Sequence, residues 1–378
     1  MGVNAIAKHL GNSAIARPLL LAVAALCVTA GAAAQDGQPQ VQIQAQPQPQ
    51  PREIRRIGLD VVVTGKSGKA IPGLSAENFS VLDNGQPAKL ASFLAVDGAP
   101  TSGAPVKPDE ATQILILLDT VNSSLTSVAY QREQVDIFPR KNEGKLELPV
   151  SIFFFNGDGA KRLAPASRDG NALAAALDKE APNLRPIPRA QGFYGAVDRI
   201  QLSISALSLL AGEEGRTRGR KVLIWLSPGW SLLPRTDSTN DRKQAEAIFQ
   251  SIVSMSTILR QARVTLYCID PIRTAGGASL NWYRYQSYLK PVTKINNADL
   301  GDLSLQVLAQ QSGGEAVGYG SDYLSGQIGT VVSTSSSYYY LSFVTAPTDR
   351  KDDFHTLKVT VDKPGLTAHT RAGYYDQP

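Results

Sequence analysis

Cysteine and histidine are scarce in this sequence, which holds 2 cysteines and 3 histidines in 378 residues. Cys27 falls in an N-terminal segment that we expect to be removed, so the remaining chain keeps Cys268 alone. One thiol cannot form an internal disulfide, and stability must therefore come from a buried core. A chain of this length can bury one or two such cores.

A strong excess of charge is also absent. The formal net charge is +5, and it falls to +3 when Lys8 and Arg17 leave with the N-terminal segment. The basic stretches Arg55-Arg56 and Arg216–Lys221 are short and are expected to be solvated. A nucleic-acid partner is therefore not expected, because such binding calls for a basic patch or stripe.

The apolar run at the N-terminus is too short for a membrane-spanning helix, which needs roughly 20 residues. It covers residues 19–30, follows Lys8 and Arg17, and ends in the small residues Gly31-Ala32-Ala33-Ala34. This pattern is typical of a signal peptide cleaved after Ala34. We expect a secreted or periplasmic protein with no membrane span after cleavage. The alternative is an uncleaved anchor.

Two segments of different character follow. Residues 35–56 are rich in Gln and Pro and lack apolar content, which predicts a disordered linker. Residues 57–111 form an N-terminal β segment with strand patterns at 59–64, 76–82 and 91–96. Asp83-Asn84-Gly85 between them is a strong hairpin signal.

The pattern changes over residues 112–335. Unbroken apolar runs at 114–118, 150–155, 222–226 and 264–269 are typical of strands covered on both faces. Helical stretches separate or follow them, at 171–177, 194–210, 243–261 and 300–311. This alternation predicts an α/β domain with a doubly wound parallel sheet of Rossmann type.

The last segment, residues 336–378, returns to strand patterns at 338–344, 356–361 and 366–372. Neither this segment nor 57–96 has enough strands to bury a face alone. We therefore expect the two chain ends to pair into one small β-sandwich that flanks the α/β domain.

The first buried strand ends at Asp119, and open α/β sheets bind ligands at the carboxyl ends of their strands. Here the chain resembles the von Willebrand factor type A domain, and more closely the VWFA-related family of exported, acidobacterial-type proteins. The resemblance rests on the order of three short motifs and would cover residues 57–375. The motifs are Gly73-Leu74 with Asn78-Phe79, Leu117-Leu118-Asp119-Thr120, and Arg371-Ala372-Gly373-Tyr374.

The resemblance implies a divalent-cation site built from Asp-x-Ser-x-Ser, a distant Thr and a later Asp. Asp119 and Ser123 keep the first and fifth positions, but Val121 stands at the third. Residues 191–195 contain no Thr, and residues 227–230 contain no carboxylate. The resemblance therefore implies a degenerate metal-ion-dependent adhesion site, and we expect no cofactor. Asp119 and Ser123 would hydrogen-bond loop amides instead. The alternative is a Mg²⁺ ion held by these two residues with water.

Few residues point to catalysis. His355 and His369 both fall on predicted terminal strands, and Cys268 lies inside an apolar strand. No Gly-x-Ser-x-Gly nucleophile motif and no dinucleotide fingerprint is present. We expect a non-enzymatic protein, with an extracytoplasmic hydrolase of unrecognised site as the alternative.

Aromatic residues near the expected sheet edge favour protein recognition, because Tyr and Trp carry much of the energy of such surfaces. We predict an adhesion or scaffold module whose partner is another protein. Ordinary loop packing is the alternative for residues 281–288. The predicted contact residues are Thr120, Asn122, Phe193, Tyr194, Trp230, Trp282 and Tyr285.

Overall fold

The computed structural model describes residues 55–97, 112–180, 192–230, 242–271, 284–317, 323–345 and 350–377. The predictions for the signal peptide, for the linker up to residue 54 and for Trp282 lie outside these residues. Among the helices of the described part, none is long and apolar enough to cross a membrane.

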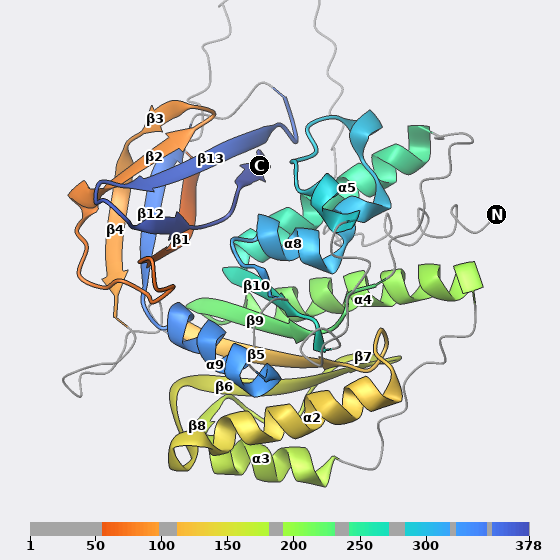
Figure 1. Ribbon diagram of the computed structural model, residues 1–378. Coiled ribbons are helices and arrows are strands. Elements are labelled where there is room, and N and C mark those ends of the chain that lie inside the picture. The colour runs from red at the N-terminus through yellow and green to blue at the C-terminus, as the bar shows by residue number, and fades with distance from the viewer. Residues whose placement is uncertain are drawn as a thin grey trace, which may run out of the picture.

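A mixed sheet forms the centre of the α/β part, with strand order β11-β10-β9-β5-β6-β7 (Figure 1). The strands are β5 (Thr112–Asp119), β6 (Lys145–Asn156), β7 (Gly159–Arg162), β8 (Ser167–Asp169), β9 (Arg220–Leu226), β10 (Val264–Ile269) and β11 (Ala316–Val317). From β11 to β6 all neighbours are parallel. Strands β7 and β8 run antiparallel to β6. The sheet is thus mixed, because the chain turns back on β6 before its next helix.

Helices cover both faces of this sheet. Alternate residues of β5 explain why: Leu115 and Leu117 join one buried cluster, whereas Ile114, Ile116 and Leu118 join the other. The first cluster packs against α4 (Gly192–Glu214), α5 (Arg242–Gln261) and α8 (Leu305–Gln311). The second packs against α2 (Leu125–Arg140), α3 (Gly170–Lys179) and α9 (Leu324–Ser335). A strand buried on both faces needs the unbroken apolar run seen in the sequence.

Helices α2 and α9 were not anticipated from the sequence. Helix α2 carries several polar residues and contains Pro139, and α9 contains two glycines and several Ser and Thr residues, which are weak helix formers. Each is held by packing instead, through inward residues such as Val135 and Phe138 of α2 and Ile328 of α9. The helix expected over 300–311 is divided at Ser304 into η6 (Leu300–Leu303) and α8.

The two chain ends meet in two four-stranded antiparallel sheets, ordered β14-β1-β12-β4 and β15-β13-β2-β3. The first end supplies β1 (Arg55–Thr64), β2 (Phe79–Asp83), β3 (Gln86–Ala88) and β4 (Leu90–Val96). The second supplies β12 (Tyr338–Thr345), β13 (Phe354–Val361), β14 (Thr367–His369) and β15 (Gly373–Tyr375). One buried cluster, which includes Leu59, Val81, Leu341 and Leu357, joins the sheets into a sandwich beside the α/β part (Figure 1).

The hairpin between β2 and β3 forms where the sequence predicted it. Asn84 and Gly85 both have positive φ, at 49° and 79°. Asp83 pairs with Gln86 across this two-residue turn. Positive φ at both central residues is what a type I′ turn requires, and Asn-Gly supplies it at low cost.

Candidate binding site at the carboxyl edge of the central sheet

The loop after β5 connects the carboxyl end of the central strand to α2. Ser124 caps the helix, and its hydroxyl accepts a hydrogen bond from the backbone N–H of Ser127 at 3.2 Å. The preceding residues, from Asp119 to Ser123, are all buried, with exposed fractions between 0% and 4%. The loop is therefore part of the core at this edge.

The carboxylate of Asp119 is surrounded by hydrogen-bond donors. Its Oδ1 accepts from the backbone N–H groups of Val121 at 2.9 Å and Asn122 at 2.8 Å. Its Oδ2 accepts from Asn122 Nδ2 at 2.8 Å and from Trp225 Nε1 at 3.0 Å. Both oxygens thus accept hydrogen bonds within the protein, and the loop amides are among the donors.

Burial and hydrogen bonding act in opposite directions on this group. Burial raises the pKa of Asp119 above its ordinary value, and hydrogen bonds from Asn122, Ser227 and Trp225 lower it. The pKa of Asp119 is raised on balance, because the hydration free energy that the carboxylate loses on burial exceeds what these hydrogen bonds restore.

Other residues of the loop are tied in the same way. Thr120 Oγ1 donates to the backbone carbonyl of Phe155 at 2.8 Å, which joins the loop to β6. Asn122 Nδ2 also reaches Ser203 Oγ on α4, at 3.0 Å. The side chains of Thr120 and Asn122 hold the sheet edge together, so the exposed contacts predicted for them are corrected to buried, structural ones.

Gln131 of α2 is a key residue that sequence reasoning missed. Its Nε2 donates to Ser123 Oγ at 2.9 Å, and its Oε1 accepts from the backbone N–H of Asp119 at 3.2 Å. Gln131 is fully buried. The signal would have been a polar residue on the inner face of α2, but α2 itself was not predicted.

These residues do not fit a divalent cation. Mg²⁺ and Ca²⁺ need several oxygen ligands that converge on one open position. Here the oxygens of Asp119 are occupied, Ser123 Oγ is bonded to Gln131, and the side chain of Val121 is packed in the apolar core. Within the described ranges, no group of three or more His, Cys, Asp and Glu residues could hold a metal ion.

The aromatic residues predicted to contact a partner are placed differently. Trp230 is 2% exposed, and its Nε1 donates to the carbonyl of Leu303 at 3.1 Å. Tyr285 is also 2% exposed and belongs to the same core cluster. The prediction of surface contacts is therefore corrected for these two residues, because packing against the sheet removes them from solvent. The side chains of Phe193 and Tyr194, and all of Trp282, lie outside the described part.

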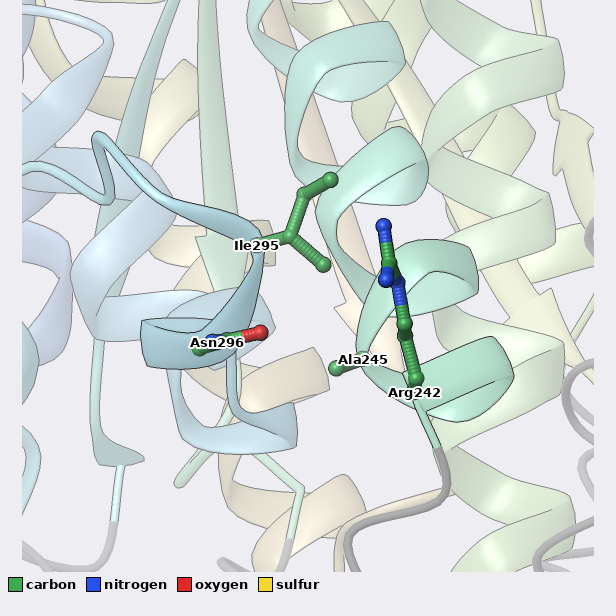
Figure 2. Close-up of a pocket in the computed structure, with 4 residues that line it drawn as sticks. All are labelled: Arg242, Ala245, Ile295 and Asn296. Carbon is green, nitrogen blue, oxygen red and sulfur yellow. The ribbon is translucent and has the colours of Figure 1, made fainter.

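A pocket of about 610 Å³ lies beside the start of α5, which follows the carboxyl end of β9 along the chain. The described residues that line it are Arg242 and Ala245 at the start of α5, and Ile295 and Asn296 of η5 (Ile295–Asn297) (Figure 2). Figure 2 shows the two pairs facing one another from separate segments. The Arg242 side chain is 83% exposed and forms an ion pair with Glu246 one turn along the helix.

The residues considered for catalysis are spread over the molecule. His355 lies on β13 and His369 on β14, both in the sandwich. Cys268 is a buried residue of β10, and burial raises the pKa of its thiol well above the ordinary value. Thus neither histidine shares the sheet edge with Asp119.

Comparison with known proteins gives weak similarities. No protein-family model matches the chain, and no curated protein matches it. The manganese-loaded TRAP protein of Plasmodium vivax is 10% identical with a TM-score of 0.34, over 78% of this chain and 99% of that one. The pilus adhesin SpaC of Lactobacillus rhamnosus GG is 11% identical with a TM-score of 0.31, over 81% and 49%.

Proximal thread matrix protein 1 of the mussel byssus is 15% identical with a TM-score of 0.24, over 43% of this chain. The matched part spans 38% of the mussel protein. At these values the similarities carry no argument about function, which has to come from the residues of this chain.

Proposed function

We propose that this chain is an exported, non-enzymatic protein-binding module, acting in adhesion or as a scaffold, which binds its partner without a divalent metal ion. The observation that carries this proposal is that both carboxylate oxygens of Asp119 already accept hydrogen bonds within the protein. A metal-dependent adhesion site needs an accessible carboxylate, and here four donors within the protein occupy both oxygens. The degenerate metal site thus serves as a structural tie between β5, β9 and the loop.

The pocket between α5 and η5 is the surface that we propose for the partner. Its walls combine the apolar side chains of Ala245 and Ile295 with the amide of Asn296 and the guanidinium of Arg242 (Figure 2). An arginine beside an apolar wall suits a carboxylate-bearing side chain with an apolar neighbour. Arg242 would then provide the positive charge that a metal ion provides in a metal-dependent site.

Metal independence is tested by titrating the protein with Mg²⁺, Mn²⁺ and Ca²⁺ in a calorimeter and by melting it with and without each ion. We expect no saturable heat and no shift of melting temperature. Saturable binding that disappears in Asp119→Asn would contradict the proposal, because it would show that the carboxylate leaves its internal donors for a metal.

The binding surface is tested with two matched charge reversals. Arg242 and Lys145 are both 83% exposed, and each is ion-paired to a nearby Glu. Arg242 lies at the carboxyl edge, whereas Lys145 begins β6 at the opposite edge. A partner captured from the cell envelope or the medium is identified by mass spectrometry and then titrated directly. We expect Arg242→Glu to weaken its affinity by about tenfold or more, equivalent to about 1.4 kcal/mol, and Lys145→Glu to leave it unchanged.

Equal affinity for both variants would place the partner elsewhere on the molecule.

Export is checked separately by sequencing the N-terminus of the protein secreted by a bacterial host. The expected first residue is Gln35, and a chain that retained residues 1–34 would contradict export by cleavage.

A further inference from the structure

A second pocket, of about 340 Å³, lies between the β-sandwich and the α/β part. The sandwich contributes residues of β1 and β14 and the turn after β1, and the α/β part contributes β10, β11 and α9. Its lining is Val62, Thr64, Gly68 and His369 on one side, and Tyr267, Gly313, Gly314, Glu315, Val317, Gln327, Thr330, Val331 and Thr334 on the other. Pockets between domains are common positions for small-molecule sites, which measure roughly 300–1,000 Å³.

Apolar side chains form the inner wall of this interdomain pocket. Val62 and Val331 are each 4% exposed, and Tyr267 is 9% exposed. Tyr267 and Val331 belong to the buried cluster under α9, so their positions are fixed by the core. The inner wall is thus preformed and suits the apolar body of a ligand.

The backbone at one side of the pocket is held closely against the sheet. A Cβ atom at Gly314 would lie 1.9 Å from the carbonyl oxygen of Leu266, so only glycine fits there. The backbone N–H of Cys268 donates to the carbonyl of Glu315 at 3.0 Å, which fixes the next residue. Glu315 therefore projects from a rigid segment at the pocket.

One carboxylate, that of Glu315, is present among the described residues that line the pocket. Glu315 is exposed, and its side chain makes no hydrogen bond or ion pair with any residue of the described ranges. Thr64, Thr330 and Thr334 also line the pocket, and Thr64 Oγ1 lies 2.9 Å from His369 Nε2. No lysine or arginine is among the described lining residues.

We propose that this interdomain pocket binds a small amphipathic amine. The apolar body would lie against Val62, Tyr267 and Val331, and the ammonium group would pair with the carboxylate of Glu315. Threonine hydroxyls would accept its remaining hydrogen bonds. The Glu315 carboxylate would repel an anionic ligand, and no lysine or arginine among the described lining residues would offset this repulsion. A bound amine would touch both parts of the chain and would stabilise their arrangement by mass action.

The test uses three probes of similar shape, 4-phenylbutylamine, 4-phenylbutanol and 4-phenylbutyrate, titrated into the protein by calorimetry. We expect the amine to bind at least tenfold more tightly than the alcohol, and the carboxylate not to bind. Glu315→Gln should reduce the amine affinity about tenfold and leave the alcohol unchanged. Glu213→Gln, which removes another exposed carboxylate at the end of α4, should change neither.

Val331→Trp would fill the pocket and should abolish binding of both ligands. Because Val331 is a core residue, Thr334→Trp at the half-buried rim provides a second blocking variant whose folding is checked by its melting temperature. Absence of binding by all three probes would overturn the proposal, as would equal amine affinity in Glu315→Gln and wild type. Arg242→Glu should leave amine binding intact, so this result is independent of the proposed partner site.

Discussion

Replacing Asp119 by Asn distinguishes a structural carboxylate from a metal ligand. Asn keeps one oxygen, which can accept from two of the four donors, and places an NH₂ group where the other oxygen was. If the NH₂ group takes the Oδ2 position, it faces the two donors that bond Oδ2 in wild type, Asn122 Nδ2 at 2.8 Å and Trp225 Nε1 at 3.0 Å. The opposite orientation faces the two backbone N–H groups instead. Either way, two hydrogen bonds to a buried acceptor are lost.

The magnitude follows from these two bonds. Each hydrogen bond to a charged acceptor contributes about 1.5–3 kcal/mol, and removing one partner leaves a buried donor unsatisfied. The variant also relieves the burial of a negative charge, which the raised pKa of Asp119 shows to be unfavourable. We therefore expect a net destabilisation of about 2–4 kcal/mol, a large share of the roughly 5–15 kcal/mol typical of a domain.

The assay is urea unfolding in EDTA, monitored both by tryptophan fluorescence and by circular dichroism. Two probes are used because a chain with more than one core need not unfold in a single step. Ser123→Ala removes one hydrogen bond, from Gln131 Nε2, and should cost about 1 kcal/mol. Asp158→Asn, at an exposed position, should stay within about 0.5 kcal/mol of wild type. An Asp119→Asn variant as stable as wild type in EDTA would refute the structural role, because removing a charge from an empty metal site costs nothing.

Three further predictions concern other buried groups. The hydrogen bond that His355 Nδ1 donates to the carboxylate of Asp83 raises the pKa of His355, so its stabilising effect is complete below about pH 6.5 and is lost as the pH rises through the folded value. The melting temperature of wild type should therefore fall over this range relative to His355→Gln; parallel profiles for the two proteins would contradict this. Arg263 pairs with Asp60 of β1 and lies 4.7 Å from the Tyr340 ring centroid, so Arg263→Met should cost about 2–3 kcal/mol in urea unfolding, with Arg263→Lys in between; a neutral Arg263→Met would show that the pair contributes nothing. The buried Cys268 thiol, whose pKa is raised by burial, should react with Ellman's reagent only after unfolding, and rapid reaction in buffer would indicate local opening of β10.

Local sequence determined the elements whose pattern is short-range. Asn84-Gly85 specifies its own turn, because both residues tolerate positive φ. The apolar runs identified four strands of the central sheet, β5, β6, β9 and β10, because strands covered on both faces have no polar side. The hydrogen bonds from the backbone N–H groups of Val121 and Asn122 to the Asp119 carboxylate are similarly local, since they span two and three residues.

Only the tertiary structure decided what the candidate site can do. One donor to Asp119 is Trp225, 106 residues away, and its hydrogen bond occupies an oxygen of the carboxylate. Trp230 was expected at the surface, but it reaches Leu303, 73 residues away, and enters the core. Whether an aromatic residue is buried, or a carboxylate is free to bind, depends on groups brought together by the whole fold. Sequence alone therefore predicted where the sheet edge lies, and long-range packing determined which of its side chains remain accessible.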